Sequence, residues 1–259
     1  MVPEALRAAL SGADTLVIAV SGGIDSLTLA AAAAQVRAPG TTVLCHARSP
    51  AVPADALGRV QDMALRTSLP LRLVDAGEFD DPAYRANPVN RCYFCKGHLY
   101  TTLSKLGAVV ASGTNLDDLG DYRPGLQAAA QHGVRHPFVD AGLDKAMVRA
   151  LARALGLGAL AELPSSPCLS SRVRTGLRIE PEALQQIDRI EAALRARLGG
   201  VALRCRQEEA GLVIEIEAAA LEALDAGARL ALSALAGELA GAAPLPLRPY
   251  QRGSAFVHA

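Results

Sequence analysis

The sequence TLVIAVSGGIDS at residues 15–26 passes from a short apolar run into a glycine-containing turn and then into a helical pattern. We interpret residues 15–20 as a buried strand and 26–36 as the helix that follows it. Two adjacent glycines allow a sharp turn with inward-pointing N–H groups, and the positive end of the helix dipole faces the same place. The stretch therefore predicts an anion-binding loop between a strand and a helix.

Strand and helix patterns keep alternating along the first two-thirds of the chain. We expect strands at residues 41–46, 71–74 and 108–112, and helices at 54–67, 93–105 and 143–155, with an irregular stretch at 80–91. Such alternation gives a parallel sheet with helices on both faces. The prediction for residues 1–176 is an α/β domain built on a doubly wound parallel sheet.

The pattern changes after Glu180. A helix is expected at 181–198, strands at 201–206 and 212–217, a helix at 221–239 and a last strand at 245–250. This α-β-β-α-β order predicts a small α+β domain over residues 177–259, joined through the Ser- and Pro-rich segment 164–176. Two domains also agree with the length, since 259 residues divided by about 150 per domain gives roughly 1.7.

Composition narrows the class of protein. Lys and Arg total 26 against 26 Asp and Glu, and only 3% of residues are aromatic, which argues against a protein that coats nucleic acid. A tRNA-modifying enzyme with one local binding patch stays compatible with these values. The N-terminus lacks a signal-peptide pattern, no apolar run reaches about 18 residues, and the five cysteines are an odd number. We expect a cytoplasmic protein with reduced thiols and no membrane segment.

The loop at residues 21–26 carries groups suited to a nucleotide. The hydroxyls of Ser21 and Ser26 are donors beside Gly22 and Gly23, and Asp25 is a candidate Mg²⁺ ligand. The loop lacks the Lys of a G-x-x-x-x-G-K-[ST] motif and the third glycine of a dinucleotide fingerprint. The motif resembles that of the PP-loop ATP pyrophosphatase superfamily, of the adenine nucleotide alpha hydrolase-like fold. That resemblance implies a loop that grips pyrophosphate while ATP adenylates a substrate, as in GMP and NAD synthetases and tRNA thiolation enzymes.

A second polar stretch, ASGTNLDDLGDYRPG at residues 111–125, follows a predicted strand. Loops at the carboxyl ends of parallel strands line ligand crevices, so Gly113 and Thr114 are candidates for the nucleotide site. Lys145 lies near the start of a predicted helix, where the dipole disfavours a cation. We favour an exposed lysine near a helix end there, with an anion such as pyrophosphate as the alternative.

The cysteines divide into two groups. Cys45 and Cys205 lie inside predicted strands and are expected in the core. Cys92, Cys95 and Cys168 are the candidates for chemistry. The C-x-x-C of Cys92 and Cys95 is compatible with a redox pair, with a Cys₃His zinc site that adds His98, or with a [4Fe–4S] cluster held by three thiolates.

Cys168 has a possible role of its own. It lies in PSSPCLSSR at residues 164–172, and the nearby Arg172 and Arg174 would stabilise a thiolate. It is therefore a candidate nucleophile.

Several motifs together resemble the LarE family, the ATP-dependent sulfur transferases of nickel-pincer nucleotide cofactor biosynthesis. They are SGGIDS at 21–26, NRCYFCK at 90–96, GTNLDDLGDYRPG at 113–125, the helix at 145–157, PSSPCLSSR at 164–172, the arginines 204 and 206, and YQRGS at 250–254. The family pattern near the end is Tyr-Arg-x-Gly-Ser, so Arg252 is shifted by one position here. The resemblance spans nearly the whole chain.

The resemblance implies a two-step reaction. A carboxylate of pyridinium-3,5-biscarboxylic acid mononucleotide, a small-molecule substrate, is adenylated by Mg²⁺-ATP, and a sulfur nucleophile then replaces AMP to leave a thiocarboxylate. Family members with three cysteines carry the sulfide on a [4Fe–4S] cluster, and we expect this type here, with Cys92, Cys95 and Cys168 as ligands. Members with only the linker cysteine give up its sulfur and keep dehydroalanine. A homo-oligomer, a hexamer by resemblance, is also implied.

The resemblance also assigns residues to roles. Cys168 and Asp25 would be catalytic, and Ser21, Gly22, Gly23, Ser26, Gly113 and Thr114 would bind ATP or pyrophosphate. Ser171, Arg172, Arg204, Arg206 and Arg252 would bind the substrate, since guanidinium groups match phosphate oxygens. The alternatives are a PP-loop tRNA thiolation enzyme, sacrificial sulfur transfer from Cys168, and a non-catalytic nucleotide- or zinc-binding module.

Overall fold

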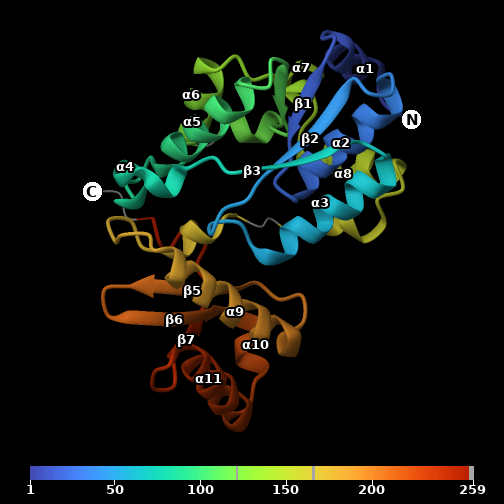
Figure 1. Cartoon of the computed structure of the whole chain (residues 1–259). Helices are drawn as coiled ribbons and strands as arrows, with labels where there is room; N and C mark the ends of the chain where they lie inside the picture. Colours follow the sequence, from blue (N-terminus) through green and yellow to red (C-terminus); the bar gives the residue numbers. More distant parts are fainter. Residues whose placement is uncertain (121, 165–166, 257–259) are drawn as a thin grey trace. The chain divides into compact units, whose positions relative to one another are not determined.

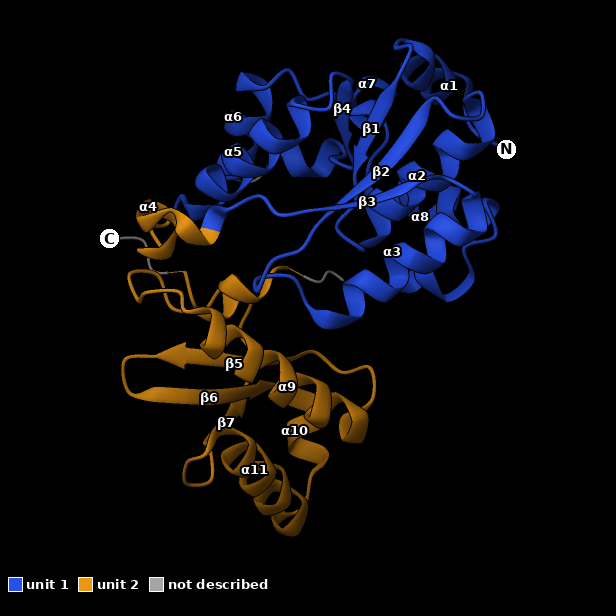
Figure 2. Ribbon diagram, viewed as in Figure 1, with its two compact units in different colours: residues 1–78, 90–166 blue, residues 79–89, 167–259 orange. Residues whose placement is uncertain are grey.

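The computed structural model describes residues 1–120, 122–164 and 167–256. The chain forms two compact units, shown in two colours in Figure 2. Unit 1 contains residues 1–78 and 90–166, and unit 2 contains residues 79–89 and 167–259. Among the described residues, no helix combines the length and the hydropathy that crossing a membrane requires.

Unit 1 is built on a parallel sheet of four strands, β1 (Leu16–Ala19), β2 (Thr42–Ala47), β3 (Leu71–Val74) and β4 (Val109–Ser112). Their order is β3-β2-β1-β4 (Figure 1). The chain adds β2 and β3 on one side of β1 and then returns to place β4 on the other side. The carboxyl ends of β1 and β4 therefore form the point where the strand order reverses, which is where ligands bind in such sheets.

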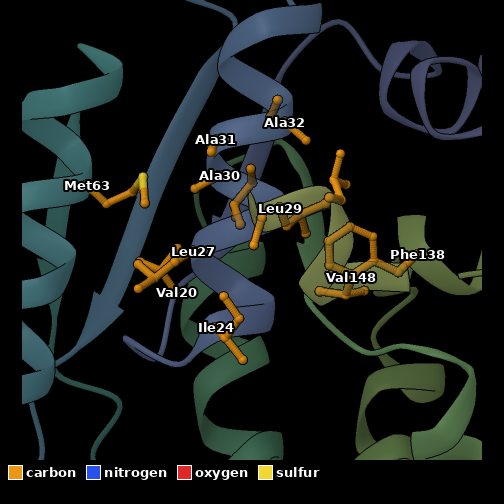
Figure 3. Close-up of a cluster of buried hydrophobic side chains, with 14 of the residues drawn as sticks. Val20, Ile24, Leu27, Leu29, Ala30, Ala31, Ala32, Met63, Phe138 and Val148 are labelled. Carbon is orange, nitrogen blue, oxygen red and sulfur yellow. The ribbon is translucent and has the colours of Figure 1, made fainter. Parts of the chain in front are cut away.

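One face of this sheet carries a large apolar core. It is covered by α1 (Glu4–Ser11), α2 (Ile24–Val36), α3 (Ala54–Thr67), α7 (Pro137–Asp140) and α8 (Lys145–Ala154). Helix α2 lies in the middle, with Met63 of α3 on one side and Phe138 and Val148 on the other (Figure 3). Because its middle is a run of buried alanines at residues 30–33, neighbouring elements approach it closely from several directions.

The opposite face packs on α5 (Arg91–Ser104) and α6 (Pro124–Gln131). Alternation along β1 explains the division, since Leu16 and Ile18 belong to the first core and Val17 belongs to this one. Cys45 is 1% exposed in this second core, as predicted. Helices on both faces of a parallel sheet confirm the predicted α/β class.

Several predicted elements have the predicted bounds, including α3 and β3. The short helices α1, α6 and α7 were not predicted, because none is longer than eight residues and none begins with a side-chain capping hydrogen bond. The remaining short turns of helix are η1 (Glu78–Asp80), α4 (Pro82–Arg85), η2 (Leu116–Leu119), η3 (Gly158–Glu162) and η4 (Leu169–Arg172).

Unit 2 contains α9 (Pro181–Leu198), β5 (Leu203–Glu208), β6 (Gly211–Ile216), α10 (Ala218–Ala223), α11 (Ala226–Ala240) and β7 (Leu247–Pro249). Strands β5 and β6 are antiparallel, and β7 runs parallel to β6. The single helix expected at 221–239 is two helices, because the Asp225 side chain accepts a hydrogen bond from the Ala228 amide and begins α11 afresh. Cys205 is fully buried in this unit, as predicted.

The two units divide the chain differently from the boundary expected at residue 176. Residues 167–176 belong to unit 2, where Val173 forms a β-bridge with Gln207. Residues 79–89 also join unit 2, through Tyr84 Oη at 2.7 Å from Ser170 Oγ and an amide of Asn87 that donates to the Arg174 carbonyl at 2.9 Å. These buried polar groups need hydrogen-bond partners, and they find them in unit 2.

Candidate functional site

The loop after β1 is held by its own serine side chains. The Ser21 amide donates to Ser26 Oγ at 3.1 Å, and Ser26 Oγ donates to the Gly23 carbonyl at 3.1 Å. Gly22 has φ +80°, and a Cβ there would lie 2.7 Å from the Ala56 carbonyl oxygen of α3. The loop therefore requires glycine at this position both for its backbone conformation and for its space.

The structure brings Gly113 to this loop. A Cβ on Gly113 would lie 2.7 Å from the Ser26 amide nitrogen, so the end of β4 touches the start of α2. Thr114 Oγ1 lies 2.9 Å from Ser112 Oγ, which in turn lies 2.9 Å from His136 Nδ1. Two stretches nearly 90 residues apart in sequence thus meet where the strand order reverses.

Lys145 meets the same loop, which corrects the expectation that it is a simple exposed lysine. Its Nζ donates to both carboxylate oxygens of Asp25, at 2.7 and 2.6 Å. The side chain of Asp144 caps α8 by accepting from the Met147 amide, and the Lys145 amide donates to Asp117 Oδ2 at 3.2 Å. The first residue of α8 therefore places its ammonium group on Asp25, the predicted Mg²⁺ ligand.

Two further residues contact the loop and were not found from the sequence. Arg59 of α3 donates from Nε to the Gly22 carbonyl at 2.8 Å and from Nη1 to Asp55 at 2.6 Å. His46, at the end of β2, is buried, and its Nδ1 lies 2.8 Å from the Val20 carbonyl. Burial lowers the pKa of His46, against the raising effect of that carbonyl. For His46 the only signal in the sequence was a polar residue at the end of a predicted buried strand. For Arg59 no signal in the sequence indicated a role at the loop.

The chemistry of this loop suits a nucleotide with its metal. Carboxylate oxygens are the ligands Mg²⁺ prefers, and Asp25 supplies two of them. Backbone N–H groups in a glycine turn at a helix N-terminus favour phosphate. The residues predicted from the sequence for this site gather here together with Lys145. They are Ser21, Gly22, Gly23, Asp25, Ser26, Gly113 and Thr114.

Cys92 and Cys95 lie in the first turns of α5, both half-buried, and neither is in a disulfide. Residues three apart on a helix are neighbours on one face, so the pair suits two thiolate positions of a cluster. His98 follows on the same helix. Within residues 1–120, 122–164 and 167–256, no three His, Cys, Asp or Glu side chains are grouped so as to hold a metal ion. The predicted trio is divided between the units, since Cys168 is an exposed residue of unit 2.

The segment after Cys168 is held inside unit 2 by Arg172. This guanidinium donates to both oxygens of Glu191, each at 2.9 Å, and both side chains are essentially unexposed. Burial lowers the pKa of Arg172, but the hydrogen bonds and charge of Glu191 outweigh it and raise the pKa. Arg174 instead pairs with Glu209. Arg172 also donates to the Cys168 carbonyl, and the charge of Cys168 further raises the pKa of Arg172.

The other predicted substrate residues also lie in unit 2. Arg204 and Arg206 share one face of β5, as alternation predicted, with their guanidinium carbons 5.8 and 6.0 Å from the Tyr250 ring centre. Arg206 is buried and pairs with Glu215 at 2.8 Å. It also donates to the Ser171 carbonyl at 2.9 Å. Arg252 is exposed. Arg172 and Arg206 thus make internal ion pairs, which the sequence reasoning did not foresee.

Arg204 is the third arginine of this group, and its Nη1 donates to the Leu203 carbonyl at 2.6 Å. It is half-buried, and its pKa is lowered first by burial and then by the positive charge of Arg172. A bound anion beside Arg204 would raise this pKa again and so offset both the burial and the repulsion from Arg172.

Comparisons with known proteins give three relatives that align over most of the chain, while no model of a protein family matches it. An uncharacterised protein of Synechocystis sp. is 40% identical over 211 residues, covering 80% of this chain and 78% of that protein. An uncharacterised protein of Methanocaldococcus jannaschii is 31% identical over 208 residues, covering 78% and 77%.

The third relative has a named activity. The pyridinium-3,5-bisthiocarboxylic acid mononucleotide synthase of Lactiplantibacillus plantarum is 29% identical over 206 residues, covering 78% of this chain and 74% of the synthase. The chain therefore belongs to one family with the Synechocystis and M. jannaschii proteins, and it is similar to the L. plantarum synthase over most of its length.

Proposed function

We propose that this protein is an ATP-dependent sulfur transferase that converts the carboxylates of pyridinium-3,5-biscarboxylic acid mononucleotide to thiocarboxylates. The name of the L. plantarum relative supports the product. The observation that carries ATP dependence is the pairing of Asp25 with Lys145 beside the Ser21–Ser26 loop. A carboxylate and a cation at an anion-binding loop suit Mg²⁺ and phosphate.

In the proposed first step, a substrate carboxylate oxygen attacks the α-phosphorus of ATP. The bond from that phosphorus to the bridging oxygen breaks, and pyrophosphate leaves with the bonding electrons. The amides of the loop and the hydroxyls of Ser21 and Ser26 would stabilise the charge that develops on the leaving group. Gly113 and Thr114 would line the same site, and Asp25 would hold the Mg²⁺.

In the proposed second step, sulfur attacks the acyl carbon and AMP leaves. Cys92, Cys95 and Cys168 would hold a [4Fe–4S] cluster, which supplies a transferable sulfide when bound. What supports this proposal is the donor chemistry: three thiols outside any disulfide, two of them neighbours on α5, are the kind of ligand that such a cluster takes. Sacrificial transfer from Cys168 is the competing route.

The substrate's phosphate would bind in unit 2. Arg204 suits it best, because an anion would offset both the burial and the repulsion that lower its pKa. Exposed Arg252 would join it. Arg172, Arg206 and Ser171 would shape this surface through the contacts they make inside the unit.

The experiment that tests the proposal measures AMP and pyrophosphate from labelled ATP under anaerobic conditions. Both should form with the biscarboxylic mononucleotide, and Asp25→Ala should abolish their formation. Asp62→Asn, at an exposed position of α3, is the matched control and should react as the wild type does. Product formation with tRNA and not with the mononucleotide would establish the tRNA thiolation alternative. Formation with neither would support the non-catalytic module.

A further inference from the structure

The position of Lys145 is electrostatically unfavourable without an anion beside it. It is the first residue of α8, where the helix dipole is positive. The anion that the structure supplies is Asp25, whose two carboxylate oxygens both accept from Nζ. Asp25 is also the residue proposed to bind Mg²⁺, so two cations compete for the same oxygens.

We infer that Lys145 exchanges partners during adenylation: it holds Asp25 before nucleotide binds and turns to the departing pyrophosphate once Mg²⁺ takes the carboxylate. This inference rests on the proposed function and adds a phosphate-contacting residue to it. The ammonium of Lys145 donates hydrogen bonds to the leaving group and transfers no proton. The electron pair of the broken phosphorus–oxygen bond remains on pyrophosphate.

The surroundings of the pair allow such an exchange. The side chains of Lys145 and Asp25 are 31% and 26% exposed, so both are reachable from solvent. Helices α2 and α8 are already packed through the apolar core that contains Leu29 and Val148, so the ion pair is not what joins them. A lysine ammonium on a flexible stem can move between two anions without moving its helix.

The test is calorimetric titration with inorganic pyrophosphate, with Mg²⁺ and with EDTA. With Mg²⁺, Lys145→Gln should bind about tenfold more weakly than the wild type, because one charge-assisted hydrogen bond to pyrophosphate is lost. In EDTA the same substitution should have a smaller effect, since Asp25 already holds Lys145. Asp25→Asn should bind more tightly than the wild type in EDTA, since it releases Lys145, and more weakly in Mg²⁺. The double variant, Asp25→Asn with Lys145→Gln, should not show the tighter binding of pyrophosphate that Asp25→Asn shows in EDTA.

The chain has only three lysines, which makes a clean control possible. Lys105→Gln, at an exposed position after α5, removes the same charge and should bind pyrophosphate as the wild type does. Lys145→Arg keeps the charge and should restore much of the binding. Circular dichroism verifies that each variant is folded.

The outcomes separate this inference from the proposed function. If the gain of Asp25→Asn persists in the double variant, Lys145 does not contact pyrophosphate, and the proposed function stands without it. If Lys145→Gln binds pyrophosphate as tightly as the wild type does with Mg²⁺, the inference is equally wrong. If the wild type with Mg²⁺ binds neither pyrophosphate nor ATP, the proposed function itself fails.

Discussion

Arg172 and Glu191 form a two-point ion pair in the interior of unit 2, with Nε and Nη2 each 2.9 Å from a carboxylate oxygen. The same guanidinium donates from Nη1 to the carbonyls of Pro167 and Cys168, at 2.6 and 3.1 Å. Glu191 also accepts from the Cys205 amide of β5 and pairs with Arg195. One buried carboxylate therefore connects α9, β5 and the backbone that presents Cys168.

Glu191→Gln should destabilise unit 2 strongly. It leaves the buried charge of Arg172 without its counter-ion, and breaking a buried pair in this way costs about 3–5 kcal/mol. Urea unfolding followed by circular dichroism measures the change. Glu162→Gln is the control, because its partner Arg153 is exposed and the unfolding midpoint should not move. An equal effect of the two substitutions would contradict this account of Glu191.

The same ion pair should depend on pH. Burial alone would raise the pKa of Glu191, but hydrogen bonds and charge from Arg172, and the charge of Arg195, outweigh burial and hold it below the ordinary 4.5. A lowered pKa means that the stabilisation is complete above about pH 4.5 and is lost as the pH falls through the lower folded value. The difference in unfolding free energy between wild type and Glu191→Gln should therefore shrink below pH 4.5. A difference that stays constant down to pH 2, in a protein still folded there, would contradict this assignment.

Gly113→Ala should disrupt the nucleotide site. The added Cβ would meet the Ser26 amide nitrogen at 2.7 Å and the Asp25 carbonyl carbon at 2.8 Å, both backbone atoms that cannot rotate away. We expect a loss of about 1–3 kcal/mol in stability together with weaker ATP binding. The measurements are thermal unfolding and titration with Mg²⁺-ATP.

Gly58→Ala is the matched control. Gly58 lies on an exposed position of α3 with nothing within 4 Å of the added Cβ. The same substitution should stabilise the protein there by about 0.5–1 kcal/mol, because alanine favours helix. The change in the free energy of unfolding should therefore have opposite signs for Gly113→Ala and Gly58→Ala. A stabilising effect of both substitutions would show that β4 and α2 are not in close contact.

The five thiols should differ in reactivity towards iodoacetamide in the reduced, metal-free protein. Cys168 is exposed and should react first, with the half-buried Cys92 and Cys95 following. Burial raises the pKa of Cys45 to about 11 and also raises that of Cys205, so both should react only after unfolding. Peptide mass mapping at pH 8 identifies the modified residues. Early modification of Cys205 would contradict its place in the core.

The sulfur-carrying group should be visible in the purified protein. Anaerobic preparation should give a brown protein with about four irons per chain if three thiolates hold a [4Fe–4S] cluster. Cys95→Ser should lose the colour, and Cys45→Ala, in the core, should keep it. A colourless protein that still forms thiocarboxylate while its own mass falls by the mass of one H₂S, as cysteine becomes dehydroalanine, would establish sacrificial transfer from Cys168 instead.

Local sequence information predicted most of the regular elements. The apolar run at 15–20, the glycines of the loop and the 3.6-residue period at 181–198 each depend on residues close together in the chain, and β1, the loop and α9 followed from them. Its position inside a predicted strand placed Cys45 in the core, and alternation placed Cys205 in the core and Arg204 and Arg206 on one face. Short helices such as α7 were missed because tertiary packing, and not local propensity, stabilises four residues.

By itself the sequence determined the α/β class, the glycine loop with Asp25 and the buried cysteines, because periodicity and turn chemistry are local properties. Only the tertiary structure decided which charged side chains pair with one another. It pairs Lys145 with Asp25, which lies 120 positions away in the sequence, and it pairs Arg172 and Arg206 with buried carboxylates. It also moved residues 79–89 into unit 2. Charged groups removed from water must find counter-ions, and which ones they find depends on how distant segments pack, which no local pattern records.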